Sequence, residues 1–246
     1  MVRLHQWASP PRFFRWSRTW ITWCSLLCVL TLLPGLYLAL AWAPADYLQG
    51  DSARIMYIHV PSAWMSMFIY ALMAFQGAVA LIWRIKLCEH LMLAAAPTGA
   101  MFTAVTLLTG MLWGRPTWGT YWVWDARLTS ELVLLFLYFG VIALAGAYSD
   151  RRAGARAAAV LCLIGVINLP IIRYSVEWWN TLHQGSSFTL MGKNTIAPSM
   201  LGVLLLMALA TKFWFLTVWF KRTRALVLDS ERRSSWITEA LREGRP

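Results

Sequence analysis

Two of the four histidines stand where they could bind a metal-containing ligand from one side of a membrane. The predicted topology places His59 and His183 on the outer side and His5 and His90 on the cytoplasmic side. His59 lies two residues before Pro61, which suits the first turn of a helix. Imidazole is the commonest metal-ligating side chain, but a histidine taken singly is more often a hydrogen-bonded interfacial residue. As two outward-facing histidines in a Trp-rich setting, His59 and His183 are equally well explained as ligands. Both interpretations stay open on the residues alone.

The segment around His183 has the pattern of a short helix. Ser175 can cap its start and Gly185 can end it. We expect this helix to place Trp179 and His183 one turn apart on the same face.

A Trp-rich segment over residues 113–127 is the second feature that could hold a ligand. Four of the sixteen tryptophans fall within it: Trp113, Trp118, Trp122 and Trp124. An aromatic belt at the membrane interface needs rings scattered at one depth, whereas these rings are concentrated between Gly and Pro residues. Indole faces supply rigid apolar area, so we interpret the segment as a platform for a large flat ligand.

Charged residues beside this platform have a structural and a functional interpretation. Asp125 can cap the next helix, and Arg127 can simply pair with it. Alternatively Arg127, with Arg54 and Arg173, meets the carboxylates of an anionic ligand through charge-assisted hydrogen bonds. The sequence leaves the two alternatives for Arg127 open.

Enzyme chemistry has no support in the sequence. The four cysteines form no C-x-x-C pair, and no Ser/His/Asp or Cys/His arrangement, paired carboxylates or phosphate-binding loop is apparent. The net charge of +11 does not indicate nucleic-acid binding, because the basic residues cluster at the ends of apolar segments. The sequence therefore favours a binding protein over an enzyme.

The elements that must position these residues are membrane spans. Of 246 residues, 59% are apolar and 13% charged, and the mean hydropathy is +0.55. We predict an all-α integral membrane protein with one domain, residues 1–246, because helices satisfy their own backbone groups in lipid. The six spans lie near 20–41, 61–83, 91–113, 128–148, 157–172 and 198–220. The fifth is short, and we expect a kink near Asn168 and Pro170 or a continuation past Arg173.

Lys and Arg residues predict the orientation. Sixteen lie in the two tails and in the links after the second and fourth spans, and five lie in the other links. The positive-inside rule therefore puts both termini in the cytoplasm and the Trp-rich loop outside. We expect the first span to be an uncleaved anchor, and Lys212, inside the sixth span, to extend its ammonium toward the basic end.

The Trp-rich loop resembles the WWD signature of haem-handling membrane proteins. The matching residues run Trp113-Gly-x-Pro-x-Trp118-Gly-x-x-Trp122-x-Trp124-Asp125-x-Arg127. The strings around the outer histidines, Tyr57-Ile58-His59-Val60-Pro61 and Trp178-Trp179-Asn180-Thr181-Leu182-His183, resemble the CcmC family of bacterial cytochrome c maturation. Tyr121 stands where the signature often has another Trp, which keeps an aromatic face there.

This resemblance implies a specific function. Members hold haem b at the outer, periplasmic face of the bacterial inner membrane, between two axial histidines that match His59 and His183 and over the WWD platform. They pass the haem to the periplasmic chaperone CcmE, and they work with an ABC transporter pair and the single-span subunit CcmD. From their place in the sequence, we expect Arg127 and Arg54 to meet the haem propionates.

Two rival functions remain. A haem permease would move haem through its own bundle, and the spans do carry polar residues: Gln76, Glu131, Asn168 and Lys212. The sequence does not align them into a continuous path. A membrane cytochrome b usually needs histidine ligands inside its spans, whereas both candidate histidines lie at the outer ends.

Overall fold

The protein is a bundle of long helices. The computed structural model describes residues 8–183 and 196–242, and within them six helical segments are long and apolar enough to cross a membrane. The predicted all-helical architecture with six candidate spans is thus confirmed. The elements in chain order are α2 (Pro10–Tyr37), η1 (Leu38–Trp42), η2 (Asp51–Ile55), α3 (Met56–Trp83), α4 (Lys86–Trp118), α5 (Ala126–Gly146), α6 (Arg151–Gly165), α7 (Asn168–Trp178), α8 (Pro198–Glu231) and α9 (Ser235–Arg242).

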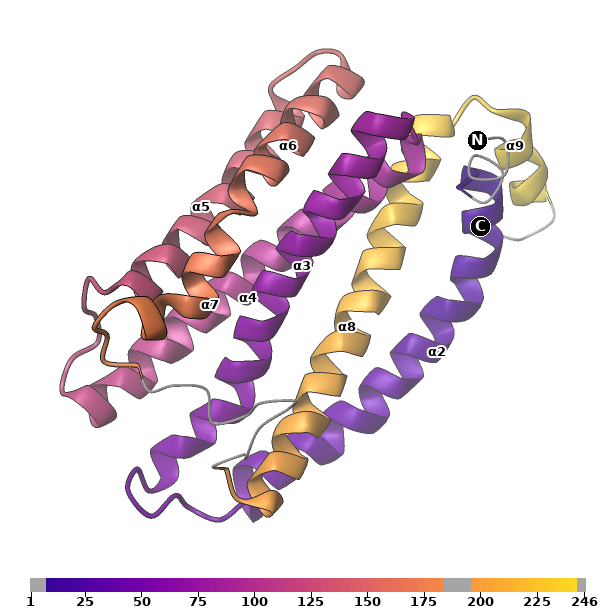
Figure 1. Cartoon of the computed structure of the whole chain (residues 1–246). Helices are drawn as coiled ribbons and strands as arrows, with labels where there is room; N and C mark the ends of the chain where they lie inside the picture. Colours follow the sequence, from indigo (N-terminus) through magenta and orange to yellow (C-terminus); the bar gives the residue numbers. More distant parts are fainter. Residues whose placement is uncertain (1–7, 184–195, 243–246) are drawn as a thin grey trace.

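Successive spans run in opposite directions, so α2 begins and α8 ends at the same end of the bundle (Figure 1). We call this the terminal end, and the opposite end the site end. Helices α2 and α8 lie side by side, and α3 and α4 form the centre, with α5, α6 and α7 on their other side.

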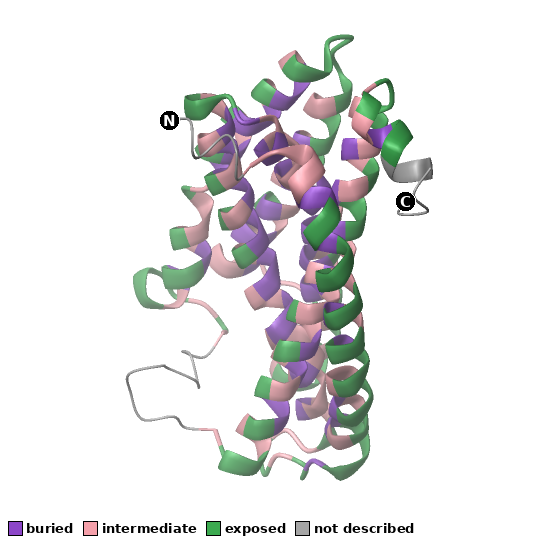
Figure 2. Ribbon diagram, turned by 90° about the vertical axis from the view of Figure 1, so that its right-hand side faces the viewer, coloured by how far each residue is buried: buried purple, intermediate pink, exposed green. Residues whose placement is uncertain are grey.

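Close packing in the centre relies on small residues beneath tyrosine rings. A Cβ at Gly99 of α4 would overlap the Tyr138 ring of α5, and a Cβ at Gly165 of α6 would overlap the Tyr70 hydroxyl of α3. Without a hydrophobic force between helices in lipid, such close approach and interhelical hydrogen bonds hold a bundle together. Tyr138 supplies one of these bonds, donating to the Ser66 carbonyl at 2.6 Å. Buried residues accordingly follow the helix interfaces in Figure 2, and exposed residues cover the outward faces.

Most helices extend beyond the predicted spans, α2 by ten residues at its start, because hydropathy marks the apolar segment and not the hydrogen-bonded helix. Helix α8 continues through the charged residues after 220. Helix α3 begins at Met56, ahead of Pro61, since a proline this close to a helix start removes only the bond to the Tyr57 carbonyl. Helix α4 includes residues 113–118 of the expected loop and ends at Gly119, whose φ of 79° only glycine adopts readily.

The fifth span is interrupted, as the sequence predicts. Helix α6 ends at Gly165, and α7 begins at Asn168 and continues past Arg173 to Trp178. The expected short helix from Ser175 to Gly185 is wrong. Ser175 lies inside α7, and Trp179 is extended with φ −135° and ψ 157°, so it shares no helix face with His183. Gly185 itself lies outside the described residues.

Lys212 lies on α8 with its Nζ 5.7 Å from the centre of the Phe68 ring of α3. Its side chain is exposed on the bundle surface. The expectation that its ammonium extends toward the basic end is not tested by this contact and stays a prediction.

Candidate functional site

A cavity of about 380 Å³ lies near the site end, between α3, α4, α5 and α7. Its lining includes two histidines, two tryptophans of the Trp-rich segment and three charged residues: His59, His183, Trp113, Trp118, Arg127, Arg173 and Glu131. Apolar residues supply most of the remaining wall, among them Leu107, Leu128 and Ile172. Its volume falls within the range of small-molecule sites, and its few polar groups converge from different helices.

His59 is held against α4 from the first turn of α3. Its Nδ1 lies 3.0 Å from Thr109 Oγ1, and that hydroxyl donates its only proton to the Val105 carbonyl at 2.6 Å. The tautomer in which His59 Nδ1 donates to Thr109 satisfies both groups, and it leaves Nε2 available to ligate. A Cβ at Gly110 would lie 3.1 Å from His59 Cε1, so glycine is what lets the imidazole approach the α4 backbone.

His183 is oriented by Asp125. Its Nδ1 lies 3.3 Å from Asp125 Oδ2, and the same carboxylate accepts the Thr181 hydroxyl. Thr181 Oγ1 also accepts the His183 backbone N–H at 3.1 Å. This arrangement directs the Nδ1 proton to the carboxylate and again leaves Nε2 free, as in the carboxylate–histidine pairs of metal proteins.

Asp125 therefore has two roles. It caps α5 as predicted, with Oδ1 accepting the Leu128 N–H at 2.8 Å. Of the two alternatives for Arg127, an ion pair with Asp125 is not formed: within the described chain Asp125 contacts His183 instead. Arg127 donates to the Ser175 hydroxyl and the Ile172 carbonyl, both at 3.3 Å, and so connects α5 to α7.

The electrostatics keep His183 neutral near pH 7. Burial lowers its pKa, and the Asp125 carboxylate only partly offsets this. Burial on its own raises the pKa of Asp125, but hydrogen bonds from Thr181 and the Leu128 N–H hold it below its ordinary value. A neutral imidazole beside an ionised carboxylate is the form that can bind a metal.

The four tryptophans of the predicted platform divide into two pairs. Trp113 packs edge-on against His59 with ring centres 5.6 Å apart, and Trp118 packs against His183 at 4.6 Å. Both line the cavity, and Trp113 is fixed by donating to Gln49 Oε1 at 2.8 Å. Trp122 and Trp124 contact each other at 5.3 Å and are not among the residues that line the cavity.

Trp124 is 76% exposed, whereas Trp122 Nε1 is buried and has no hydrogen-bond partner in the described part of the chain. A buried donor of this kind is costly unless something accepts from it. Trp122 thus remains a candidate contact for a ligand that extends beyond the cavity.

Only some of the predicted outer cations line the cavity. Arg127 and Arg173 line the cavity. Arg54 does not line it: its Nε lies 2.9 Å from Asp51 Oδ1, and its Nη1 donates to the Ala39 carbonyl at 3.2 Å. Arg115 is exposed and donates to the Gly119 carbonyl, and Lys193 lies outside the described residues.

Sequence reasoning did not single out Thr109, Thr181 or the lining role of Glu131. Glu131 is 5% exposed and accepts the Ser66 hydroxyl at 2.8 Å. A signal was present on α4, where cavity-lining residues follow at intervals of three and four and so share one face: Thr106, Gly110, Trp113 and Thr117. Thr181 could not have been found, because its segment is not helical.

Comparison with known proteins identifies the family. The family described as heme exporter protein C, CcmC, matches residues 3–238. The chain belongs to the CcmC family. Relatives described as heme exporter protein C include that of Escherichia coli K12, 50% identical over 98% of both chains, and that of Haemophilus influenzae, 48% identical over 95% of both. A putative cytochrome c biosynthesis ccmC-like mitochondrial protein of Marchantia polymorpha is 41% identical over 88% of this chain and 90% of its own length.

Membership in the CcmC family confirms the resemblance that the outer-loop strings indicated. The family description is that of a haem-handling membrane protein of cytochrome c biogenesis and not of an enzyme, which agrees with the interpretation of the sequence. The match extends over nearly the whole chain, so it includes every element that builds the cavity.

Proposed function

We propose that this CcmC-family chain binds haem b in the cavity at the site end and delivers it to a periplasmic haem chaperone. The observation that carries the proposal is the pair of histidines that enter one cavity from different elements. His59 and His183 each have Nδ1 engaged by a protein acceptor and Nε2 free. In this role the two Nε2 atoms fill the axial positions of the haem iron.

The residues present fit haem better than a bare metal ion. Within the described residues, no group of three or more His, Cys, Asp or Glu side chains could hold an ion. Haem needs only two protein ligands, because the porphyrin supplies the other four. The edge-on Trp113 and Trp118 rings and the apolar walls are suited to a flat apolar macrocycle.

Haem also carries two propionates, and Arg127 is the candidate to meet one of them. The Arg127 guanidinium lines the cavity and uses only part of its five N–H donors in the bonds to α7. Arg54, the other predicted partner, is committed to Asp51 and Ala39. We therefore place Arg127 in the propionate contact, and Arg54 at the edge of the site.

Replacing Arg127 by alanine should weaken haem binding roughly ten- to a hundredfold, since a charge-assisted pair contributes about 1.5–3 kcal/mol. Haem titration followed by the Soret absorbance measures this. Arg54→Ala should have a smaller effect, and Arg115→Ala, which removes an exposed outer charge, should have none. Equal affinity in all three variants would mean that the propionates face water or a partner subunit.

Replacing Asp125 by asparagine isolates the orientation of His183. Asparagine keeps the cap of α5 but removes the ionised acceptor of the His183 proton, so haem affinity should fall about ten- to a hundredfold at unchanged thermal stability. Asp150→Asn is the matched control, because Asp150 caps α6 through the Arg152 and Ala153 N–H groups far from the cavity. Unchanged haem affinity in Asp125→Asn would contradict the orienting role.

The wider assignment rests on the family and on charge. The excess of Lys and Arg at the terminal end supports cytoplasmic termini and a periplasmic site in the bacterial inner membrane. Family membership supports the chaperone CcmE, an ABC transporter pair and the small subunit CcmD as partners.

The alternative of a haem permease has less support. Beyond Glu131, the bundle toward the terminal end is filled by fully buried side chains: Ile69, Tyr70, Met73, Leu134 and Tyr138. Such packing leaves no open path through the bundle among these residues. It therefore favours release of haem at the site end, where a periplasmic chaperone can reach it. A cytochrome b is disfavoured because both candidate ligands lie at one end of the bundle.

Transfer to the chaperone tests the proposed function. Haem-loaded protein is mixed with the soluble domain of apo-CcmE, and haem bound covalently to the chaperone is measured after denaturing electrophoresis. Wild-type protein should load the chaperone, and the His59→Gly/His183→Gly variant should not. Loading at the same rate by free haem without the protein would refute delivery.

A further inference from the structure

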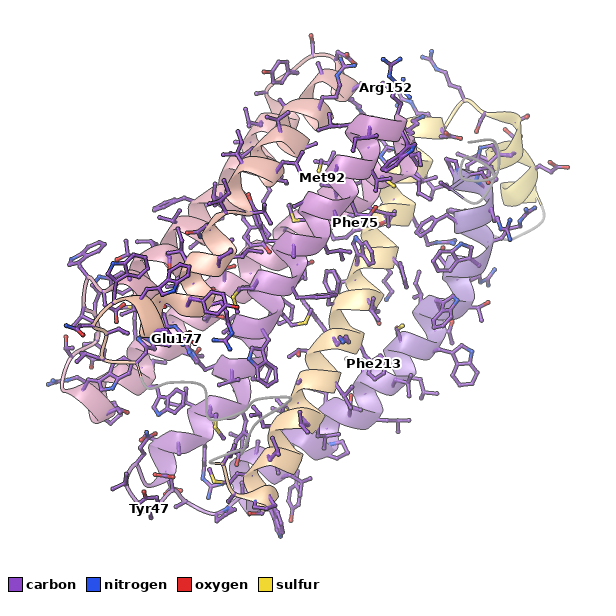
Figure 3. All side chains as sticks on the ribbon, in the orientation of Figure 1. Tyr47, Phe75, Met92, Arg152, Glu177 and Phe213 are labelled. Atoms are coloured by element: carbon purple, nitrogen blue, oxygen red, sulfur yellow. The ribbon has the colours of Figure 1, made fainter. Side chains whose placement is uncertain are left out.

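A second, larger cavity lies at the terminal end of the bundle. Its volume is about 1150 Å³, and it is bounded by the start of α4, the α5–α6 connection and the end of α8. Six basic side chains line it: Lys86, Arg151, Arg152, Arg222, Arg232 and Arg233. Three acidic side chains join them: Glu89, Asp229 and Glu231. Figure 3 shows Arg152 at this end, far from Tyr47 and Glu177 at the site end.

Part of this charge is already committed within the protein. Lys86 Nζ lies 3.2 Å from Glu231 Oε1, and Arg151 pairs with Asp229. Arg222 Nε donates to the Ala94 carbonyl at 3.2 Å.

The remaining guanidinium groups are those of Arg152, Arg232 and Arg233. Within the described part of the chain these three form no ion pair. Arg152 belongs to α6, whereas Arg232 and Arg233 follow the end of α8. Six cations against three carboxylates leave the cavity with an excess of positive charge. The Arg152 charge acts on the Glu89 carboxylate across the cavity, but the excess of cations that converge from separate elements still favours an anion as the occupant.

Apolar side chains also line the cavity. Leu93 lies about two turns into α4 from Lys86, and Leu226 lies before the arginines at the end of α8. Ala145, at the end of α5, and Ala155, in the second turn of α6, also line the cavity. We call the arginines at the helix ends the rim and the leucines further along α4 and α8 the apolar floor. Arg222 lies one turn deeper than Leu226, but its guanidinium is bonded to the Ala94 carbonyl.

This arrangement follows the order of groups in a phospholipid. The positive-inside rule places the terminal end at the cytoplasmic leaflet, whose headgroups then lie level with the rim. A free phosphate ion would use the rim alone and leave the apolar floor exposed. A lipid would place its phosphate on the rim and the first carbons of its chains on the floor.

We propose that this cavity binds the headgroup of an anionic phospholipid, with Arg152, Arg232 and Arg233 on its phosphate and Leu93 and Leu226 against the start of its acyl chains. The site is separate from the haem cavity and does not depend on the proposed haem function. The bound lipid fixes the end of α8 to the α5–α6 connection.

Native mass spectrometry of the full-length protein in neutral detergent tests the proposal. The variant Arg152→Gln/Arg232→Gln/Arg233→Gln is compared with Arg15→Gln/Arg18→Gln/Lys221→Gln, which removes three exposed cations of the same end outside the cavity. Each is titrated with phosphatidylglycerol, with phosphatidylcholine and with phosphatidylglycerol in the presence of inorganic phosphate. Circular dichroism and gel filtration verify that each variant is folded.

We expect one phosphatidylglycerol to bind wild type more tightly than phosphatidylcholine does. Its apparent Kd should rise at least about tenfold in the cavity variant and less than twofold in the control. Equal affinity for the two lipids, or an equal loss of phosphatidylglycerol affinity in both variants, would overturn the proposal. An acidic segment of a partner protein would then be the better candidate occupant of the cavity. Competition by millimolar inorganic phosphate would also overturn it, in favour of a soluble anion.

Discussion

Replacing His59 and His183 together by glycine should abolish the low-spin, six-coordinate spectrum of the haem-loaded protein. Each imidazole reaches the cavity with Nε2 free, so both axial positions lose their ligand in the double variant. Optical and electron paramagnetic resonance spectra of the ferric protein measure the change. Each single variant should give a five-coordinate or mixed-ligand species, and added imidazole should restore the low-spin signal.

Two features make this test specific. His90→Gly is the matched control, because His90 lies at the terminal end and bonds to the Ser230 hydroxyl at 3.0 Å. Glycine in place of His59 leaves the bonds that fix Thr109 to the α4 backbone intact, so the bundle should still form. A low-spin bis-imidazole spectrum that survives in the double variant would refute the ligand assignment.

The second large effect concerns the tryptophans that pack against the two histidines. Replacing Trp113 and Trp118 by alanine should strip haem from the purified protein at unchanged levels in the membrane, because both rings form cavity wall beside the two histidines. Loss of two aromatic contacts that also orient the imidazoles should lower haem affinity at least about a hundredfold. Haem per protein, from pyridine haemochrome absorbance, measures the effect.

Trp20→Ala/Trp23→Ala is the control for this experiment. Both rings lie on α2, are 56% exposed, and are far in sequence from the cavity walls. An interfacial belt predicts the opposite pattern, in which the Trp113/Trp118 variant has fewer molecules in the membrane but the same haem per molecule. That outcome would mean that Trp113 and Trp118 do not contact haem.

Hydropathy and charge predicted much of the fold. The number of spans and the interruption near Asn168 followed from apolar length and from proline chemistry, and the structure agrees. The helix ends could not be predicted, because a helix continues through polar residues wherever its backbone bonds remain favourable. Residues 113–118 illustrate this: their Gly and Pro content suggested a loop, but Gly119 is where α4 ends.

The contacts of the site were less predictable. The sequence placed His59, His183 and the Trp-rich segment on one side of the membrane, yet the only partner it offered for the Asp125 carboxylate was Arg127, as one of two alternatives. The structure pairs Asp125 with His183 across a large sequence separation, which only the folded chain can establish. The buried Glu131 and the acceptor Thr109 were likewise invisible as partners, because their significance depends on which helix faces which.

The most direct test of the central claim is the position of the porphyrin in an electron cryo-microscopy map of the haem-loaded protein. We expect density in the cavity at the site end, with the iron between His59 Nε2 and His183 Nε2, Trp113 and Trp118 beside the ring, and Arg127 at a propionate. Porphyrin density midway through the bundle, or iron bound by other residues, would contradict it.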